Sequence, residues 1–332
     1  MSFHAWYGRT MPPVEQVRED IWSIPVPFQD NPMRYTFCYA LRGDGETVIV
    51  DPGWDSAEGF EVLQQGLDVA GLGLDSVTGV LVTHVHPDHH GLTHFVAEAR
   101  PDAWIGMSAD EALALSELRS VEAQSGTRIR EQLHAAGVPE DDPLQEMGRH
   151  RDPSFLDRMP APDLVLQDGD AVPLRGRTVR ALLTPGHTMG HLCFLDDDDD
   201  VILTGDHVLP RISPNVGLHS HSAVSPVRSF LASLDRVGRI EREVLPAHQW
   251  RFRNLPERVR ELEEHHRERL EEILTILRSE PATAWELAGR LTWAHGWDGL
   301  EAMQRWPAIA ETEAHLRYLL EDARLAASEE AP

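Results

Sequence analysis

Residues Thr83–Gly91 read THVHPDHHG, which places four histidines and an aspartate within nine residues. The stretch follows an apolar, β-branched run at 77–84 that predicts a strand, and a helix is predicted at 91–99. A lone histidine usually has a structural role, but a cluster of this density at the end of a strand is typical of a metal site. The cluster therefore predicts a metal centre at the edge of a β-sheet.

The spacing within the cluster indicates two metal positions. In an extended segment, residues two apart face the same side, so His84 and His86 can bind one ion. The proline that follows turns the chain, and Asp88 and His89 are then displaced toward a second position. We expect His90 to point away from both.

Two metal ions need more ligands than this cluster supplies, and later strands offer them. Each of three further predicted strands runs directly into a residue that commonly binds metals. These residues are His187 after the strand 178–183, Asp206 after the strand 201–204, and His248 after the strand 243–246. Functional side chains are often found at such strand ends, so we expect all three to lie beside the histidine cluster.

In the type and order of these residues the chain resembles the metallo-β-lactamase-fold hydrolase superfamily. The matching motifs are VDPG (50–53), HVHPDH (84–89), PGH (185–187), GDH (205–207) and PAH (246–248). The resemblance covers about residues 19–255. It implies an α+β fold, an αββα sandwich with the site at one edge of its two sheets.

The resemblance also implies a ligand set. One divalent ion would be bound by His84, His86 and His187, a second by Asp88, His89 and His248, and Asp206 would bridge the two. Asp51 resembles a buried aspartate that orients the ligand loop, although an ordinary turn residue before Pro-Gly is the alternative. We expect His191 and His207, which closely follow ligands, to support the site without binding metal.

Oxygen and nitrogen ligands without a thiolate suit zinc, with manganese or iron as alternatives. Two such ions about 3.5–4 Å apart can hold a hydroxide at neutral pH, and Asp88 is the expected catalytic residue that orients it. The expected reaction is hydrolysis of a small ester, thioester or lactone.

Two other enzyme classes use similar ligands, namely a phosphodiesterase or ribonuclease and a mononuclear iron persulfide dioxygenase. A third alternative is a non-catalytic sensor that reads DNA or a partner through its C-terminal region. The formal net charge is −25, and all 30 basic residues are arginines. So acidic a surface repels phosphate backbones and counts against nucleic-acid binding.

The residues that contact the substrate are harder to predict than the metal ligands. Candidates near the first hairpin and in the loop after Asp206 are Tyr35, Arg211, His219 and His221. Exposure to solvent without substrate contact is the alternative for each.

The chain is predicted to form a catalytic domain at 1–255, with a helical insertion at 108–160 that covers the metals as a lid. Strands are expected within 19–50 and at 77–84, 103–107, 163–166, 178–183, 191–195, 201–204 and 243–246. Helices are expected at 56–70, 91–99, 225–237 and 283–291, from 256 onward, and at about 307–327. The last three belong to a C-terminal module, 256–332, that resembles a winged-helix-like appendage and serves packing or a homodimer.

The cysteine content, the apolar runs and one acidic run give three further expectations. The cysteines Cys38 and Cys193 each stand in an apolar strand-like run, which predicts buried free thiols. Neither a membrane-spanning run nor a signal peptide is evident, so a cytoplasmic location without a membrane partner is expected. The acidic run at 196–200 predicts a hairpin turn, with a calcium site as the alternative.

Overall fold

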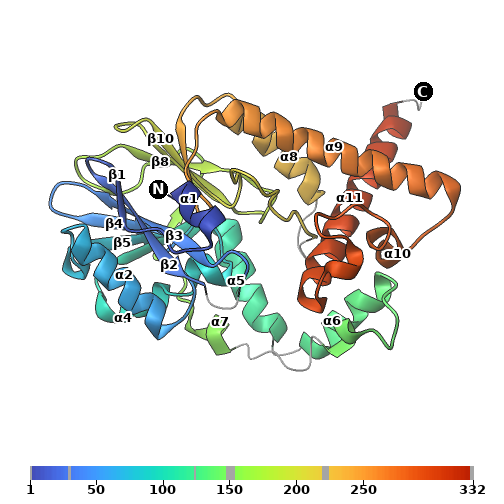
Figure 1. Cartoon of the computed structure of the whole chain (residues 1–332), viewed down its shortest axis with the longest axis horizontal. Helices are drawn as coiled ribbons and strands as arrows, with labels where there is room; N and C mark the ends of the chain where they lie inside the picture. The colour runs from blue at the N-terminus through green and yellow to red at the C-terminus, as the bar shows by residue number, and fades with distance from the viewer. Residues whose placement is uncertain (1, 29–30, 123–124, 147–153, 219–223, 330–332) are drawn as a thin grey trace.

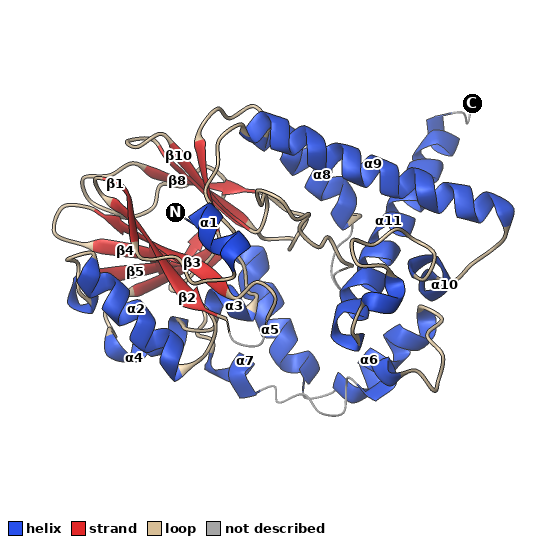
Figure 2. Cartoon of the chain, viewed as in Figure 1, coloured by secondary structure: helices blue, strands red, loops and turns tan. Residues whose placement is uncertain are grey.

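A computed structural model describes residues 2–28, 31–122, 125–146, 154–218 and 224–329. In these residues the chain forms two β-sheets packed face to face, with helices on the outer side of each (Figure 1). Figure 2 shows the resulting order of layers, helix–sheet–sheet–helix, and further helices beyond one end of the sheets. The predicted αββα sandwich is confirmed.

The first sheet has seven strands in the described residues, in the spatial order β1-β2-β3-β4-β5-β6-β7. Its strands are β1 (Glu15–Arg18), β2 (Ile21–Pro27), β3 (Tyr35–Arg42), β4 (Thr47–Val50), β5 (Val77–Leu81), β6 (Trp104–Ser108) and β7 (Leu164–Leu166). Neighbours are antiparallel from β1 to β4 and parallel from β4 to β7. The parallel strands all direct their carboxyl ends to one edge.

The second sheet has four strands in the described residues, in the order β11-β10-β9-β8. Its strands are β8 (Val179–Leu183), β9 (Leu192–Asp196), β10 (Val201–Gly205) and β11 (Glu243–Pro246). Only β10 and β11 are parallel. The carboxyl ends of β8, β10 and β11 precede the three later candidate ligands.

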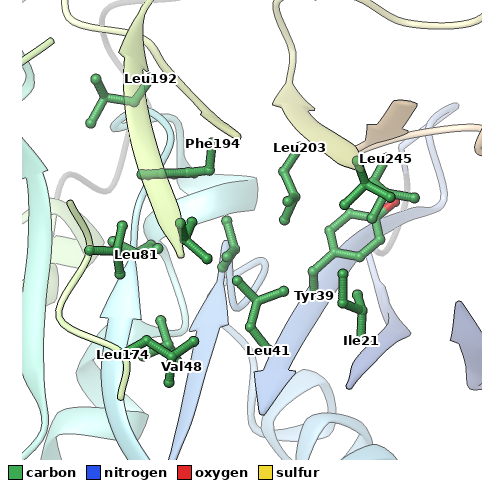
Figure 3. Close-up of a cluster of buried hydrophobic side chains, with 14 of the residues drawn as sticks. Ile21, Tyr39, Leu41, Val48, Leu81, Leu174, Leu192, Phe194, Leu203 and Leu245 are labelled. Carbon is green, nitrogen blue, oxygen red and sulfur yellow. The ribbon is translucent and has the colours of Figure 1, made fainter. Parts of the chain in front are cut away.

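The central strands are buried on both faces, which explains why their sequences are almost wholly apolar. Along β3, Phe37, Tyr39 and Leu41 enter the core between the sheets, while Cys38 and Ala40 face the helices outside. Figure 3 shows this central core, where Phe194 and Leu203 of the second sheet point toward side chains of the first. Both cysteines are buried and free, as predicted.

Helices cover both outer faces. The helices of the first part of the chain are α1 (Ser2–Gly8), α2 (Ala57–Val69), η1 (Leu74–Ser76), α3 (Pro87–His90) and α4 (Thr93–Ala99). Apolar residues of α2 and α4 pack on the first sheet. The second sheet is covered by α8 (Pro226–Val237) and by the start of α9 (Leu255–Ser279).

The insertion divides between two environments. Its helices are α5 (Ala109–Glu122), α6 (Ser125–Ala135), η2 (Pro143–Glu146) and α7 (Ser154–Arg158). Residues of α5 and α7 pack against the first sheet, whereas Leu133 and Leu144 share a core with Ala288 and Ile309 of the C-terminal region. The amide of Trp285 also donates to the carbonyl of Ala136 at 2.9 Å.

The described C-terminal region is helical, as predicted, and consists of α9, α10 (Ala284–Ala288), η3 (Trp297–Gly299) and α11 (Ala302–Glu329). Residues 256–329 contain no β-strand, so a winged-helix hairpin is absent from that range. Ile273 is fully buried against Leu287, with Leu316 and Leu319 packed on the same cluster, whereas Leu320 is 59% exposed. Apart from Leu320, these apolar residues are therefore largely covered within one chain and give no support to the expected homodimer.

The sequence-based elements differ from the structure in a few places. The helix α1 was not predicted, and α11 begins at Ala302, whereas a start at about residue 307 was expected. A proline in the second turn removes only one helical hydrogen bond, and packing of Trp306 and Ile309 compensates for it.

The acidic run does form the turn between β9 and β10, but Asp196 is completely buried and pairs with Arg177 at 2.5 Å. Arginines therefore neutralise part of this run. Among the described helices, none combines the length and apolarity needed to cross a membrane.

Candidate metal centre

Four strand ends bring the candidate ligands together. His84 and His86 follow β5, and Pro87 then starts the single turn α3, which carries Asp88 and His89. The other three, His187, Asp206 and His248, follow β8, β10 and β11. The structure thus brings all seven side chains to one edge of the two sheets.

The first group consists of three imidazoles. The Nε2 atom of His84 lies 2.8 Å from Nδ1 of His86 and 3.2 Å from Nε2 of His187. Nε2 of His187 is 3.1 Å from Nδ1 of His86. These three nitrogens face a common point, and together they make one group that could hold a metal ion.

The second group contains Asp88, His89 and His248. Oδ2 of Asp88 lies 3.2 Å from Nε2 of His248 and 3.5 Å from Nε2 of His89. Asp206 lies between the groups, because its Oδ1 is 3.4 Å from His248 while its Oδ2 is 3.8 Å from Nε2 of His187. This position is the one a bridging carboxylate needs.

Hydrogen bonds fix the tautomers of four histidines. Nδ1 of His187 donates to the carbonyl oxygen of Asn215 at 2.7 Å, and Nδ1 of His248 donates to the carbonyl oxygen of Tyr35 at 2.9 Å. Nδ1 of His89 donates to the carboxylate of Asp51 at 2.8 Å. In the neutral form of each ring the free lone pair is therefore on Nε2, the nitrogen that faces the centre of the site.

The tautomer of His84 follows from the same network. The hydroxyl of Thr83 donates to Oδ2 of Asp51 at 2.7 Å, so it can only accept from Nδ1 of His84, 3.0 Å away. Nε2 of His84 is therefore also unprotonated. In their neutral forms, all four imidazoles therefore have Nε2 free to bind a cation.

Two buried atoms at the centre lack hydrogen-bond partners, namely Nε2 of His89 and Oδ1 of Asp206. An unsatisfied buried nitrogen and carboxylate oxygen are each costly unless another group completes them. Nitrogen and oxygen donors without sulfur suit a divalent ion of the zinc type. The residues present therefore fit a metal centre.

The two groups differ in electrostatics. Burial and the neighbouring imidazoles hold the pKa of His84 well below its ordinary value, and burial lowers the pKa of His86 to about 3. Burial also acts to lower the pKa of His248, but the carboxylates of Asp206 and Asp88 outweigh burial and raise that pKa to about 10. The imidazoles of the first group are thus uncharged, whereas in the second group carboxylates stabilise the charge of the imidazoles.

Asp51 supports the ligands and belongs to none of the groups of described residues that could hold a metal ion. It is 2% exposed, and its Oδ1 accepts the amide of Thr83 at 2.8 Å in addition to the two bonds at Oδ2. Its φ of 53° is a left-handed conformation that aspartate tolerates better than most residues. Gly205 before Asp206 has φ 49°, and a Cβ there would lie 2.7 Å from Nε2 of His191, so only glycine fits.

The other histidines lie as expected, outside the ligand groups. Nε2 of His191 accepts the amide of Asp206 at 3.2 Å, which fixes the backbone of the bridging residue. His207 is buried beside Phe230, with ring centroids 5.0 Å apart. His90 points away from the site, where its Nε2 donates to the carbonyl of Pro160 at 2.9 Å.

Tyr35 was predicted to contact substrate, and the structure corrects this. Its side chain is completely buried, and its hydroxyl donates to the carbonyl of Gln249 at 2.9 Å. Tyr35 therefore supports the loop that carries His248. Arg211 is exposed, but its guanidinium donates to the hydroxyl of Tyr7 at 2.5 Å. His219 and His221 lie outside the described residues.

Glu111 is one of the supporting residues that the sequence did not indicate. Glu111 of α5 is completely buried, and its two oxygens accept the amides of Val85 at 2.7 Å and Gly190 at 2.9 Å. It therefore joins the loop of His84 and His86 to the loop of His187. Burial raises the pKa of Glu111 to about 7 despite these hydrogen bonds. No local sequence motif indicates the role of Glu111, because the residues that it contacts are distant in the sequence.

Comparisons with known proteins agree with this architecture. A family model described as the metallo-beta-lactamase superfamily matches residues 32–250. A solved metallo-beta-lactamase family protein from Thermus thermophilus is 32% identical, with a TM-score of 0.77 over 93% of this chain and 95% of its own.

Curated relatives are also similar to the chain. The lactamase-like protein adaB of Aspergillus niger is 25% identical over 272 residues, which are 80% of this chain and 67% of that protein. An atrochrysone carboxyl ACP thioesterase of Pseudocercospora fijiensis is 25% identical over 189 residues, or 57% of this chain. That match spans only 39% of the thioesterase.

Proposed function

The chain belongs to the metallo-beta-lactamase superfamily, and on that premise we propose that it is a hydrolase that uses two divalent metal ions, zinc in the first place. In this proposal His84, His86 and His187 bind one ion, and Asp88, His89 and His248 bind the other. Asp206 binds both. The substrate is a small thioester, ester or lactone.

The observation that carries this proposal is the division of the Asp206 carboxylate between two groups of imidazoles. One oxygen lies toward His248 and the other toward His89 and His187, at 3.4, 3.6 and 3.8 Å respectively. A purely structural aspartate would accept short hydrogen bonds from nearby donors, yet the nearest partner of the buried Oδ1 is Nε2 of His248, at 3.4 Å. A carboxylate shared by two cations explains both facts.

The chemistry follows from the donor set. When bound, the ions supply Lewis acidity and lower the pKa of a water molecule toward about 7, so that a nucleophile exists at neutral pH. In our proposal the carboxylate of Asp88 accepts a hydrogen bond from that water and orients it toward the substrate carbonyl. The chain has no lysine to serve as an alternative nucleophile.

The choice of a thioester is supported by a relative, since the matched protein of Pseudocercospora fijiensis is named as a thioesterase. The net charge of −25 supports a small substrate over a nucleic acid, because phosphate backbones bind basic surfaces. Esters and lactones share the same acyl transfer to water. The proposed substrate class therefore includes esters and lactones as well as thioesters.

The test combines metal analysis with a substrate panel. We expect elemental mass spectrometry of zinc-loaded protein to find two ions per chain, and hydrolysis of acyl thioesters, esters or lactones. An Asp88→Ala variant should lose this activity, whereas Asp102→Ala, at an exposed turn, should retain it.

Three results would contradict the proposal. They are one ion or none per loaded chain, activity on phosphodiesters alone, or iron with oxygen-dependent turnover of persulfides. The last two would revive the nuclease and the dioxygenase respectively.

A further inference from the structure

The C-terminal helix α11 lies against the chain segment that follows Asp206. The amide of Leu218 donates to the carbonyl of Ala310 at 3.2 Å, and a Cβ at Gly217 would lie 3.3 Å from Cβ of Ala310. In Figure 1 the chain after β10 extends from the sheets toward α11. This segment is therefore in direct contact with a helix that lies 92–96 residues later in the chain.

Asn215 is the point at which this contact reaches the metal centre. Its carbonyl oxygen accepts Nδ1–H of His187 at 2.7 Å. Its side-chain amide donates to the carbonyl of Pro307 and to Oε2 of Glu311, both at 3.1 Å. One residue thus contacts a candidate metal ligand on one side and α11 on the other.

The two acceptors on α11 use the full donor capacity of the Asn215 amide, which has two N–H groups. Glu311 is 9% exposed, so its carboxyl is nearly removed from water. A buried carboxyl that accepts from an amide gives a stronger and more directional contact than a surface one. These two hydrogen bonds therefore fix the orientation of Asn215, including its backbone carbonyl, which accepts from His187.

We infer that Glu311 is a positioning residue of the metal centre, which acts through Asn215 to orient the imidazole of His187. The C-terminal helix α11 is then part of the active site's support and not merely an appendage. This inference rests on the proposed metal centre, because its consequence is the affinity for an ion bound by His187. It assigns to α11 a role that packing alone does not require.

Three variants test the connection. Asn215→Ala keeps the backbone carbonyl that accepts from His187 but removes the amide, and Glu311→Ala removes the acceptor on α11. Each should weaken zinc binding by about tenfold in competition with a chelator, since partners of metal-ligating histidines commonly contribute 10–100-fold. The double variant should bind zinc about as weakly as either single variant, because both remove the same contact.

Two controls separate positioning from general damage. Glu311→Gln retains an oxygen acceptor for Asn215 and should bind zinc as the wild type does. Glu321→Ala removes another contact of α11, with the amide of Ser225, and should leave zinc affinity unchanged. Circular dichroism melting should show that all variants remain folded.

A second readout does not need metal. In metal-free protein labelled with ¹⁵N-histidine, the wild-type signal of His187 should report the Nδ1–H tautomer, assigned by its loss in a His187→Gln variant. Glu311→Ala should shift this signal toward a mixture of tautomers, and Glu321→Ala should not.

Wild-type zinc affinity together with an unshifted His187 signal in Glu311→Ala would overturn the inference. A wild-type protein that binds no zinc would instead refute the proposed function, and the tautomer signal would still decide whether Glu311 positions His187.

Discussion

The two groups of candidate ligands lie side by side but are built on different principles. The group of His84, His86 and His187 contains only imidazoles, and burial keeps them uncharged. The group of His89 and His248 faces two carboxylates, which hold the pKa of both imidazoles above the ordinary value against the effect of burial. Ion binding by the first group should therefore depend on the orientation of its imidazoles, and ion binding by the second group on the charge of its carboxylates.

This difference indicates what each group can tolerate. An ion among neutral imidazoles depends on tautomers set by Thr83 and Asn215, so small changes of orientation should weaken it. An ion beside carboxylates gains from their charge, so removal of a charge should weaken it more strongly.

The largest effect is expected for Asp206→Asn, because this carboxylate serves both groups. The variant should keep at most one ion per chain and lose at least about 10²-fold in kcat. Elemental analysis after zinc loading and dialysis, with kinetics on the best substrate, checks both. Two tightly bound ions in this variant would show that Asp206 does not bridge.

Asp88→Ala should be almost as damaging to turnover but different in stoichiometry. It removes a ligand from the second group alone, so one ion should remain with His84, His86 and His187. We expect at least a 10²-fold fall in kcat, since the orienting carboxylate is lost as well. If both ions vanish together in metal titrations, the two groups are not independent.

Asp51→Asn should have an intermediate effect. Asp51 contacts His89 directly and His84 only through Thr83, so the ion of the second group should be released first, with an affinity about 10–100-fold lower. Thr83→Val is the matched comparison, because it removes the direct partner of His84 and affects His89 only through Asp51. Chelator competition on both variants should show the opposite order of release.

Glu111→Gln should give the smallest effect. A glutamine retains one acceptor oxygen, but its NH₂ group opposes the second backbone amide, at Val85 or Gly190. We expect the free energy of unfolding to fall by about 1–3 kcal/mol with less than a tenfold change in kcat. Urea unfolding checks this, with the exposed Asp110→Asn on the same helix as a control.

The sandwich and the gathering of the seven ligand candidates were predictable because short motifs carry them. Each candidate follows a strand within a few residues, and parallel strands direct their carboxyl ends to the same edge. The short apolar run of β3, rich in aromatic residues, likewise predicts a strand. Each motif joins a ligand to the strand that positions it, so the relation can be read from neighbouring residues in the sequence.

The supporting residues were not predictable, because their partners are far away in the sequence. Glu111 reaches Gly190, 79 residues later, and Asn215 reaches Glu311, 96 residues later. Tyr35 was misjudged for a related reason. An aromatic residue beside a hairpin can face solvent or the core, and only the packing of the second sheet decides which.

The shared core of the insertion and the C-terminal helices has a consequence for how the protein is made. Leu133 and Leu144 are covered by residues that include Ala288 and Ile309, which are synthesised much later. At ribosomal rates of about 5–20 residues per second, the apolar face of the insertion stays uncovered for roughly 10–30 s. During that interval the nascent chain exposes a surface that chaperones recognise, although the sheets beside it have most of their own strands.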